Sequence, residues 1–122
     1  MVPWYNVLLD STLSTTRYLM DNYAEVEFRV VSQEERDGHI FRTSEFVMGK
    51  KVIVHSIVDI PARENPREFV EIMREKTTPI GDALRDNNWK VAREILYHDA
   101  RSKVYVMKGD VNLKITEHYY TM

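Results

Sequence analysis

Alternating apolar and polar positions mark two stretches of this chain as strands that are buried on one side. In residues 111–120 one face is apolar except for a single carboxylate: Val111, Leu113, Ile115, Glu117 and Tyr119. In residues 39–48 one face is mostly apolar except for a single guanidinium: Ile40, Arg42, Ser44, Phe46 and Met48. A buried charge must be paired or must bind something, because leaving it alone is costly. The pattern therefore predicts either an internal ion pair or a polar anchor at each end of an apolar pocket.

Turn-forming residues divide the rest of the chain into further strands and helices. Three helices are predicted to open near Ser14, Pro66 and Pro79, where capping residues or prolines precede helical patterns. The predicted strands cover residues 26–30, 39–48, 52–60, 89–97, 103–108 and 111–120. They form two hairpin-like groups separated by helices. This order favours the α+β class, with a single antiparallel β-sheet and helices packed on it, over a parallel sheet.

Length and charge limit the classes of protein that fit. The 122 residues suit one domain, 1–122, and a 43% hydrophobic fraction is enough for one core. A net charge of -2 with scattered basic residues argues against binding to nucleic acid or to an anionic membrane. No apolar run is long enough to span a bilayer, and Met1–Asp10 does not resemble a signal peptide. We therefore expect a cytoplasmic protein, monomeric or homodimeric.

The chain lacks the residues or spacings that several common catalytic, metal-binding and phosphate-binding sites require. The chain has no cysteine, which excludes disulfides, thiolate metal sites and cysteine nucleophiles. Its four glycines lie far apart and form no phosphate-binding loop. Its four histidines lack metal-binding helical spacing, so no metal site is expected.

Two further residues are ambiguous. His55 lies between Ile53 and Ile57 on one strand face, as a core histidine or, if it lines the pocket, as a proton-transfer group. Arg93 shares a face with Val91, Ile95 and Tyr97 and could belong to an ion pair or to the site.

Four segments, in the same order along the chain, carry a family resemblance. They are Leu8-Leu9-Asp10 with Ser14-Thr15-Thr16-Arg17-Tyr18-Leu19, then Ile40-Phe41-Arg42, Thr78-Pro79-Ile80-Gly81-Asp82-Ala83-Leu84, and Leu113-Lys114-Ile115-Thr116-Glu117-His118-Tyr119. Their order resembles the chorismate lyase family, including its archaeal and mycobacterial branch that forms 4-hydroxybenzoate. The resemblance covers nearly the whole chain.

The resemblance implies an enzyme that removes the enolpyruvyl group of chorismate, giving 4-hydroxybenzoate and pyruvate without metal or organic cofactor. It implies an antiparallel sheet with helices packed on it. Arg42 would hold the ring carboxylate, aided by the backbone N–H groups of Thr15 and Ile80. Glu117 would lie by the ether oxygen that leaves and by the developing hydroxyl.

The chain departs from the bacterial enzymes at one strand. They have a second pocket arginine where this chain reads Val54-His55-Ser56-Ile57, so His55 or Ser56 would take that position and Arg93 could replace the arginine from a neighbouring strand. Two other functions remain open. One is a non-catalytic domain that binds a small acid, like the sensor domains of some transcription regulators with this fold. The other is a structural protein in which Arg42 and Glu117 pair.

Overall fold

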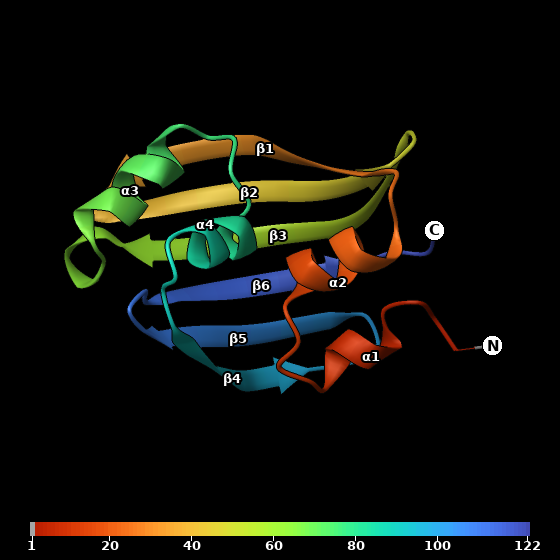
Figure 1. Cartoon of the computed structure of the whole chain (residues 1–122). Coiled ribbons are helices and arrows are strands. Elements are labelled where there is room, and N and C mark those ends of the chain that lie inside the picture. The colour runs from red at the N-terminus through yellow and green to blue at the C-terminus, as the bar shows by residue number, and fades with distance from the viewer. Residues whose placement is uncertain (1) are drawn as a thin grey trace.

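The computed structural model describes residues 2–122, which form one six-stranded antiparallel sheet with the helices on one face (Figure 1). The helices are α1 (Asn6–Leu9), α2 (Thr15–Asn22), α3 (Arg67–Arg74) and α4 (Ile80–Asp86), with a 3-10 turn η1 (Ala62–Glu64). The strands are β1 (Val26–Arg36), β2 (His39–Met48), β3 (Lys51–Pro61), β4 (Val91–His98), β5 (Ser102–Gly109) and β6 (Leu113–Tyr119). The predicted α+β class is confirmed.

The chain forms two halves with the same order of elements. Two helices precede three strands in each half, α1–α2–β1–β2–β3 and then α3–α4–β4–β5–β6. The strand order across the sheet is β1-β2-β3-β6-β5-β4, so each half is a meander and the last strands of the two halves pair at the centre (Figure 1). No repeat was visible in the sequence. The repetition lies in the order of elements.

Local chemistry explains the helix starts. The Ser14 side chain caps α2 by accepting a hydrogen bond from the Arg17 backbone N–H at 3.2 Å, as predicted. Pro66 and Pro79 stand immediately before α3 and α4. The short helix α1 was not predicted.

Strand β1 extends well beyond the predicted end at residue 30. A bulge between Val30 and Ser32 shifts its register against β2. A bulge adds one residue to one strand and breaks the period of two, so the sequence pattern stops there although the strand continues. The predicted strand over 89–97 begins later, at Val91, and ends at His98.

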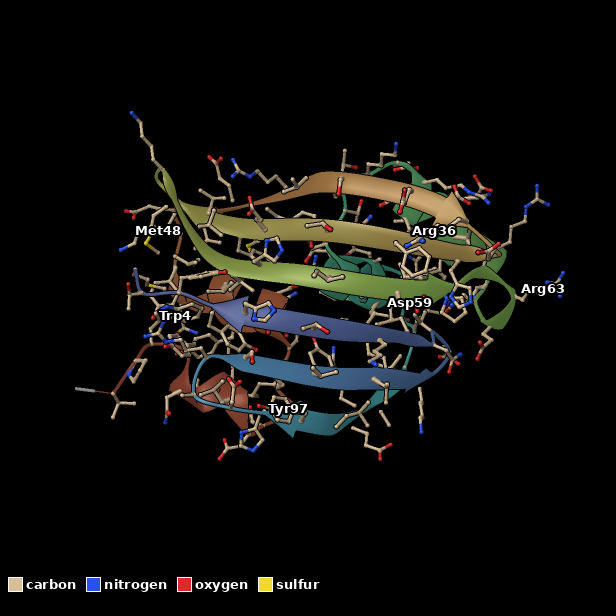
Figure 2. All side chains as sticks on the ribbon, turned by 180° about the vertical axis from the view of Figure 1, so that it is seen from behind. Trp4, Arg36, Met48, Asp59, Arg63 and Tyr97 are labelled. Carbon is tan, nitrogen blue, oxygen red and sulfur yellow. The ribbon has the colours of Figure 1, made fainter. Side chains whose placement is uncertain are left out.

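One face of the sheet is covered by the helices and the other is open. The helices cover one face, where apolar side chains form two clusters: one under α3 and α4 that includes Ile40, Phe69 and Leu113, and one under α1 and α2 that includes Leu8, Leu19 and Tyr119. Figure 2, seen from behind, shows the other face of the sheet with no helix of the described chain across it. Asp59 lies on this open face.

Two buried cations connect the sheet to the helices. Arg42 on β2 donates hydrogen bonds to the carbonyls of Met73, at the end of α3, and of Thr78, at 3.2 and 2.7 Å. Lys103 on β5 donates to the carbonyls of Leu8, in α1, and Ser11, at 2.6 and 3.2 Å. Each cation belongs to the middle strand of one half and holds the first helix of the other half. Cations are favourable at helix C-termini, where carbonyls lack partners inside the helix.

The Asn65 side chain links the segment between β3 and α3 to the turn between β5 and β6. Its side chain donates to the carbonyls of Pro61 and Asn112 and accepts from the Asn112 backbone N–H, at 2.7, 2.8 and 2.7 Å. Asn65→Ala should lower the free energy of unfolding by about 2 kcal/mol, because it leaves partly buried main-chain groups without partners. Urea denaturation measures the change.

Asn22→Ala is the matched control, because the Asn22 side chain makes one exposed hydrogen bond to its own helix, to the Tyr18 carbonyl. Its effect should stay within about 0.5 kcal/mol. Equal losses in the two variants would contradict a special role for Asn65.

Candidate functional site

A small cavity of about 40 Å³ lies between the sheet and the first turns of α2 and α4. We call it the inner cavity. Its lining combines apolar groups such as Phe46, Val58 and Met107 with polar side chains from both layers. The polar lining includes Thr15, Arg42, Ser44, Ser56, Arg93 and Glu117. A space of this size holds a few water molecules and is too small for an aromatic ring.

Two serines on the central strands create this space. Ser44 pairs with Ser56 across β2 and β3, and Ser56 pairs with Glu117 across β3 and β6. The three residues therefore form one row across the sheet, with all three side chains buried on the helix-covered face. The short serine side chains leave room above the sheet that the larger side chains in the adjacent rows, such as Phe46 and Arg42, do not leave.

Arg42 is fully buried, and no carboxylate within residues 2–122 forms an ion pair with it. Its Nε donates to the Gln33 side chain at 3.0 Å, and its terminal nitrogens donate to the carbonyls of Thr78 and Met73. All three acceptors are neutral, so its positive charge is not cancelled. Burial lowers the pKa of Arg42 to about 10, which still leaves the guanidinium charged at neutral pH.

Glu117 is the buried acid of the cavity. Its Oε1 accepts a hydrogen bond from the Thr15 hydroxyl at 3.0 Å and a longer one from the Tyr119 hydroxyl at 3.4 Å. Burial raises the pKa of Glu117, and the positive charge of Lys103 and these hydrogen bonds oppose that rise only in part. The raised pKa makes this carboxyl group easier to protonate than an exposed glutamate.

Arg93 reaches the cavity from β4, on the far side of Glu117 from Arg42. Its Nε is buried and has no hydrogen-bond partner. Within residues 2–122, no carboxylate oxygen lies within 4.0 Å of a guanidinium nitrogen of Arg42 or Arg93. The inner cavity therefore has two guanidiniums without carboxylate partners, and one carboxyl group between them.

The structure brings together six of the seven predicted site residues. Arg42, Glu117, Ser56 and Arg93 line the inner cavity from the sheet, and Thr15 and Ile80 line it from the helices. Arg42 and Glu117 are not paired with each other, because each bonds to the separate partners described above. The predicted internal ion pair is therefore wrong.

His55 is the exception, because it does not line the inner cavity and lies instead at a different surface pocket with Glu45. Successive side chains of a strand point to opposite faces, so the placement of Ser56 in the cavity turns His55 to the open face. There its Nδ1 lies 3.4 Å from a carboxylate oxygen of Glu45. Tyr97 also differs from the prediction: a bulge between Ile95 and Tyr97 takes it off the face of Arg93, and its side chain is exposed.

Several polar residues near the cavity were missed in the sequence. They include Ser44 in the lining, Gln33 on Arg42, and Lys103 beside Glu117 in the β5–β6 register. Lys103 had a detectable signal, because it alternates with Tyr105 and Met107 on an otherwise apolar face. Gln33 had none, because it lies beyond the bulge of β1.

No group of three or more histidine, aspartate or glutamate side chains within residues 2–122 is placed to hold a metal ion. None of the helices described above is long and apolar enough to cross a membrane. No protein-family model matches the chain, and no curated protein matches it. A function for the inner cavity must therefore be argued from its own chemistry.

The raised pKa of Glu117 predicts a pH-dependent stability. A carboxyl group whose pKa is higher in the folded state stabilises the fold at acidic pH, and that contribution is lost as the pH rises from the unfolded value through the folded one. Glu117→Gln is neutral at every pH and keeps the shape. Relative to wild type it should therefore gain stability as the pH rises from 4 to 8, as measured by urea denaturation.

Glu45→Gln is a control whose stability relative to wild type should change with pH in the opposite direction. Burial raises the pKa of Glu45, but hydrogen bonds and charges from Arg29 and His55 outweigh this effect and lower it overall. This variant should therefore lose stability relative to wild type as the pH rises. A Glu117→Gln profile parallel to that of wild type would contradict a raised pKa.

Proposed function

We propose that the protein is a lyase that eliminates pyruvate from chorismate and leaves 4-hydroxybenzoate. The observation that carries the proposal is the charge order across the sheet, with Arg42 on β2 and Arg93 on β4 on either side of Glu117 on β6. This order suits a ligand with an acidic group at each end and a proton-accepting atom between them. Chorismate has a ring carboxylate, an ether oxygen and an enolpyruvyl carboxylate. The four sequence segments that resemble chorismate lyases add support.

Arg42 would bind the ring carboxylate. A guanidinium has five N–H donors, and three of those of Arg42 are engaged, so one N–H remains on each terminal nitrogen. Two such donors can bind the two oxygens of one carboxylate. Thr15 and Ile80 begin α2 and α4, so their backbone N–H groups have no acceptor inside their helices and would assist. Arg93 would bind the second carboxylate with its free Nε.

The reaction needs little more than orientation and one proton transfer. The bond between the ring carbon and the ether oxygen breaks, a ring carbon loses a proton, and the ring becomes aromatic. Protonated Glu117 would give its proton toward the leaving oxygen, so that the enolpyruvate departs as pyruvate, and it would recover a proton from the ring. Aromatisation supplies the driving force, and exclusion of water keeps the groups aligned.

Ligand entry would require α2 and α4 to separate. They meet at Gly81, where an added Cβ would lie only 2.8 Å from the Thr16 Cβ, so the two helices are in close contact there. The inner cavity is far below the roughly 300 Å³ at which small-molecule sites begin. The contact at Gly81 lies between the cavity and a surface pocket, because Gly81 and Thr16 line both spaces.

A non-catalytic domain that binds a small acid is the second candidate, and the partners of Arg42 favour it. Arg42 holds the Met73 and Thr78 carbonyls, which lie on the two sides of the α3–α4 connection. A ligand carboxylate on the two free N–H groups would draw on the same positive charge and weaken the hydrogen bonds of the guanidinium to these carbonyls. Ligand binding would then alter the position of the connection, which is how a sensor domain signals.

Turnover tests the lyase function directly. Wild-type protein incubated with chorismate should form 4-hydroxybenzoate and pyruvate in equal amounts, measured by chromatography and a coupled pyruvate assay. Glu117→Gln should lower kcat about 10²–10⁴-fold, because it removes the titratable proton. Glu45→Gln, on the open face, should retain activity. Binding of 4-hydroxybenzoate without any turnover would favour the sensor function, and full activity in Glu117→Gln would remove Glu117 from the mechanism.

The role of Arg42 as the carboxylate anchor predicts a large loss of binding. Arg42→Ala should weaken 4-hydroxybenzoate binding by about 2 kcal/mol or more, because the carboxylate would enter a buried site without its partner. Arg63→Ala removes an exposed arginine outside the ion pairs and makes the same change in net charge. Isothermal titration calorimetry on both variants, with folding checked by circular dichroism, measures the difference. Equal affinities in the two variants would contradict the anchor role.

A further inference from the structure

A second pocket lies outside the inner cavity, between α2, α4 and the chain that leads into β4. We call it the outer pocket. Its volume is about 430 Å³, within the range of roughly 300–1,000 Å³ that is typical of small-molecule sites. It shares Ser14, Thr16, Gly81 and Arg93 with the inner cavity, so the two spaces are neighbours separated by the contact between Gly81 and Thr16.

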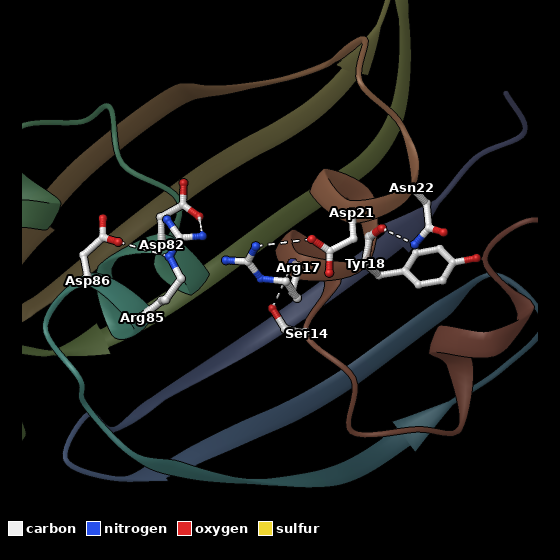
Figure 3. Close-up of polar contacts among 8 residues, drawn as sticks. All are labelled: Ser14, Arg17, Tyr18, Asp21, Asn22, Asp82, Arg85 and Asp86. Atoms are coloured by element: carbon white, nitrogen blue, oxygen red, sulfur yellow. Dashed lines mark hydrogen bonds and ion pairs between the residues drawn. The ribbon is translucent and has the colours of Figure 1, made fainter.

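All charged side chains that line the outer pocket are cations: Arg17, Arg85, Lys90 and Arg93. Two of them are neutralised by acids on their own helices. Arg17 pairs with Asp21 at 3.3 Å, and Arg85 pairs with Asp86 at 3.1 Å and with Asp82 at 3.4 Å (Figure 3).

The other two cations, Lys90 and Arg93, have no acidic side chain as an ion-pair partner within residues 2–122. Within this part of the chain, no carboxylate oxygen lies within 4.0 Å of a side-chain nitrogen of Lys90 or Arg93. Arg93 also keeps a buried Nε without a hydrogen-bond partner. Buried donors in native proteins nearly always have an acceptor, so this nitrogen indicates that a bound group supplies one. The cations of the pocket without an ion-pair partner thus lie at the start of β4, where the acid Asp110 accepts a hydrogen bond from the Lys90 backbone N–H at 2.7 Å and does not line the pocket.

Beside these cations the pocket has an apolar wall formed by Trp89, Leu84 and Val91. The indole of Trp89 packs edge-to-face on Phe69, with ring centroids 5.8 Å apart, and its backbone N–H donates to the Leu84 carbonyl at 2.9 Å. Its orientation is therefore fixed by the core. A fixed aromatic side chain next to two cations suits a flat apolar ring that carries a negative group.

We propose that the outer pocket is a separate binding site for a small aromatic carboxylate, which Lys90 and Arg93 hold by its acid group while its ring packs on Trp89. The site is open to solvent without any separation of α2 from α4. Arg93 lines both spaces, so its side chain would serve the ligand of one site at a time. The site requires no reaction in the inner cavity, so it goes beyond the function proposed above and does not depend on it.

Nuclear magnetic resonance of the ¹⁵N-labelled protein tests the site, with benzoate as the probe and benzamide as its uncharged analogue. The protein has two tryptophans, so Trp4, which lies at the other end of the chain and outside the pocket, serves as an internal reference for Trp89. Benzoate should shift the Trp89 indole N–H signal and the Lys90 and Val91 amide signals saturably, and leave the Trp4 signal unchanged. Benzamide should bind at least about tenfold more weakly, because the charge-assisted hydrogen bonds are lost.

Two charge reversals with the same net charge complete the test. Lys90→Glu should raise the benzoate Kd measured at Trp89 at least about tenfold, whereas Lys50→Glu, in the exposed turn between β2 and β3, should change it less than about twofold. Absence of a shift at Trp89, equal binding of benzamide, or equal effects of the two reversals would overturn the proposal. Chorismate turnover is a separate readout, so failure of the lyase function and failure of the outer pocket are distinguishable.

Discussion

Two buried cations hold the helical layer on the sheet by donating hydrogen bonds to main-chain carbonyls. Arg42 holds the end of α3 and the Thr78 carbonyl, and Lys103 holds α1 and Ser11. Burying a charge is costly, and carbonyl groups at helix ends reduce that cost without cancelling the charge. Among the described residues that are buried, Glu117 is the one acid beside these two cations. The covered face of the sheet therefore buries more cations than acids, and the proposed anionic ligand rests on this imbalance.

The fold places this charge where space is available. The two α–α–β–β–β halves meet at β3 and β6, and the row Ser44, Ser56 and Glu117 crosses that junction. Apolar clusters lie on both sides of the row, so the polar groups are collected in one belt between two cores. A site at the junction of the halves receives residues from all six strands and from α2 and α4, and no single half could supply it.

Alternation along the strands allowed much of this arrangement to be predicted. The faces of β2 and β6 were assigned correctly, and with them the burial of Arg42 and Glu117. Alternation cannot show where a bulge lies, which is why the end of β1 and the side of Tyr97 were wrong. It also cannot give the register between strands far apart in sequence. The partners of Arg42, which come from β1 and from the ends of helices, therefore had to come from the structure.

The central claim is that Arg42 binds the ring carboxylate of an organic acid at the junction of the halves and that Glu117 lies by the oxygen on the opposite side of the ring. A crystal structure of the protein grown with 4-hydroxybenzoate tests it most directly. The account predicts the carboxylate on the free N–H groups of Arg42, the phenol oxygen within hydrogen-bond distance of Glu117, and a wider gap between Gly81 and Thr16 than in the closed cavity. An inner cavity that stays closed and empty at saturating ligand, with Arg42 still bound only to Gln33, Thr78 and Met73, would contradict it.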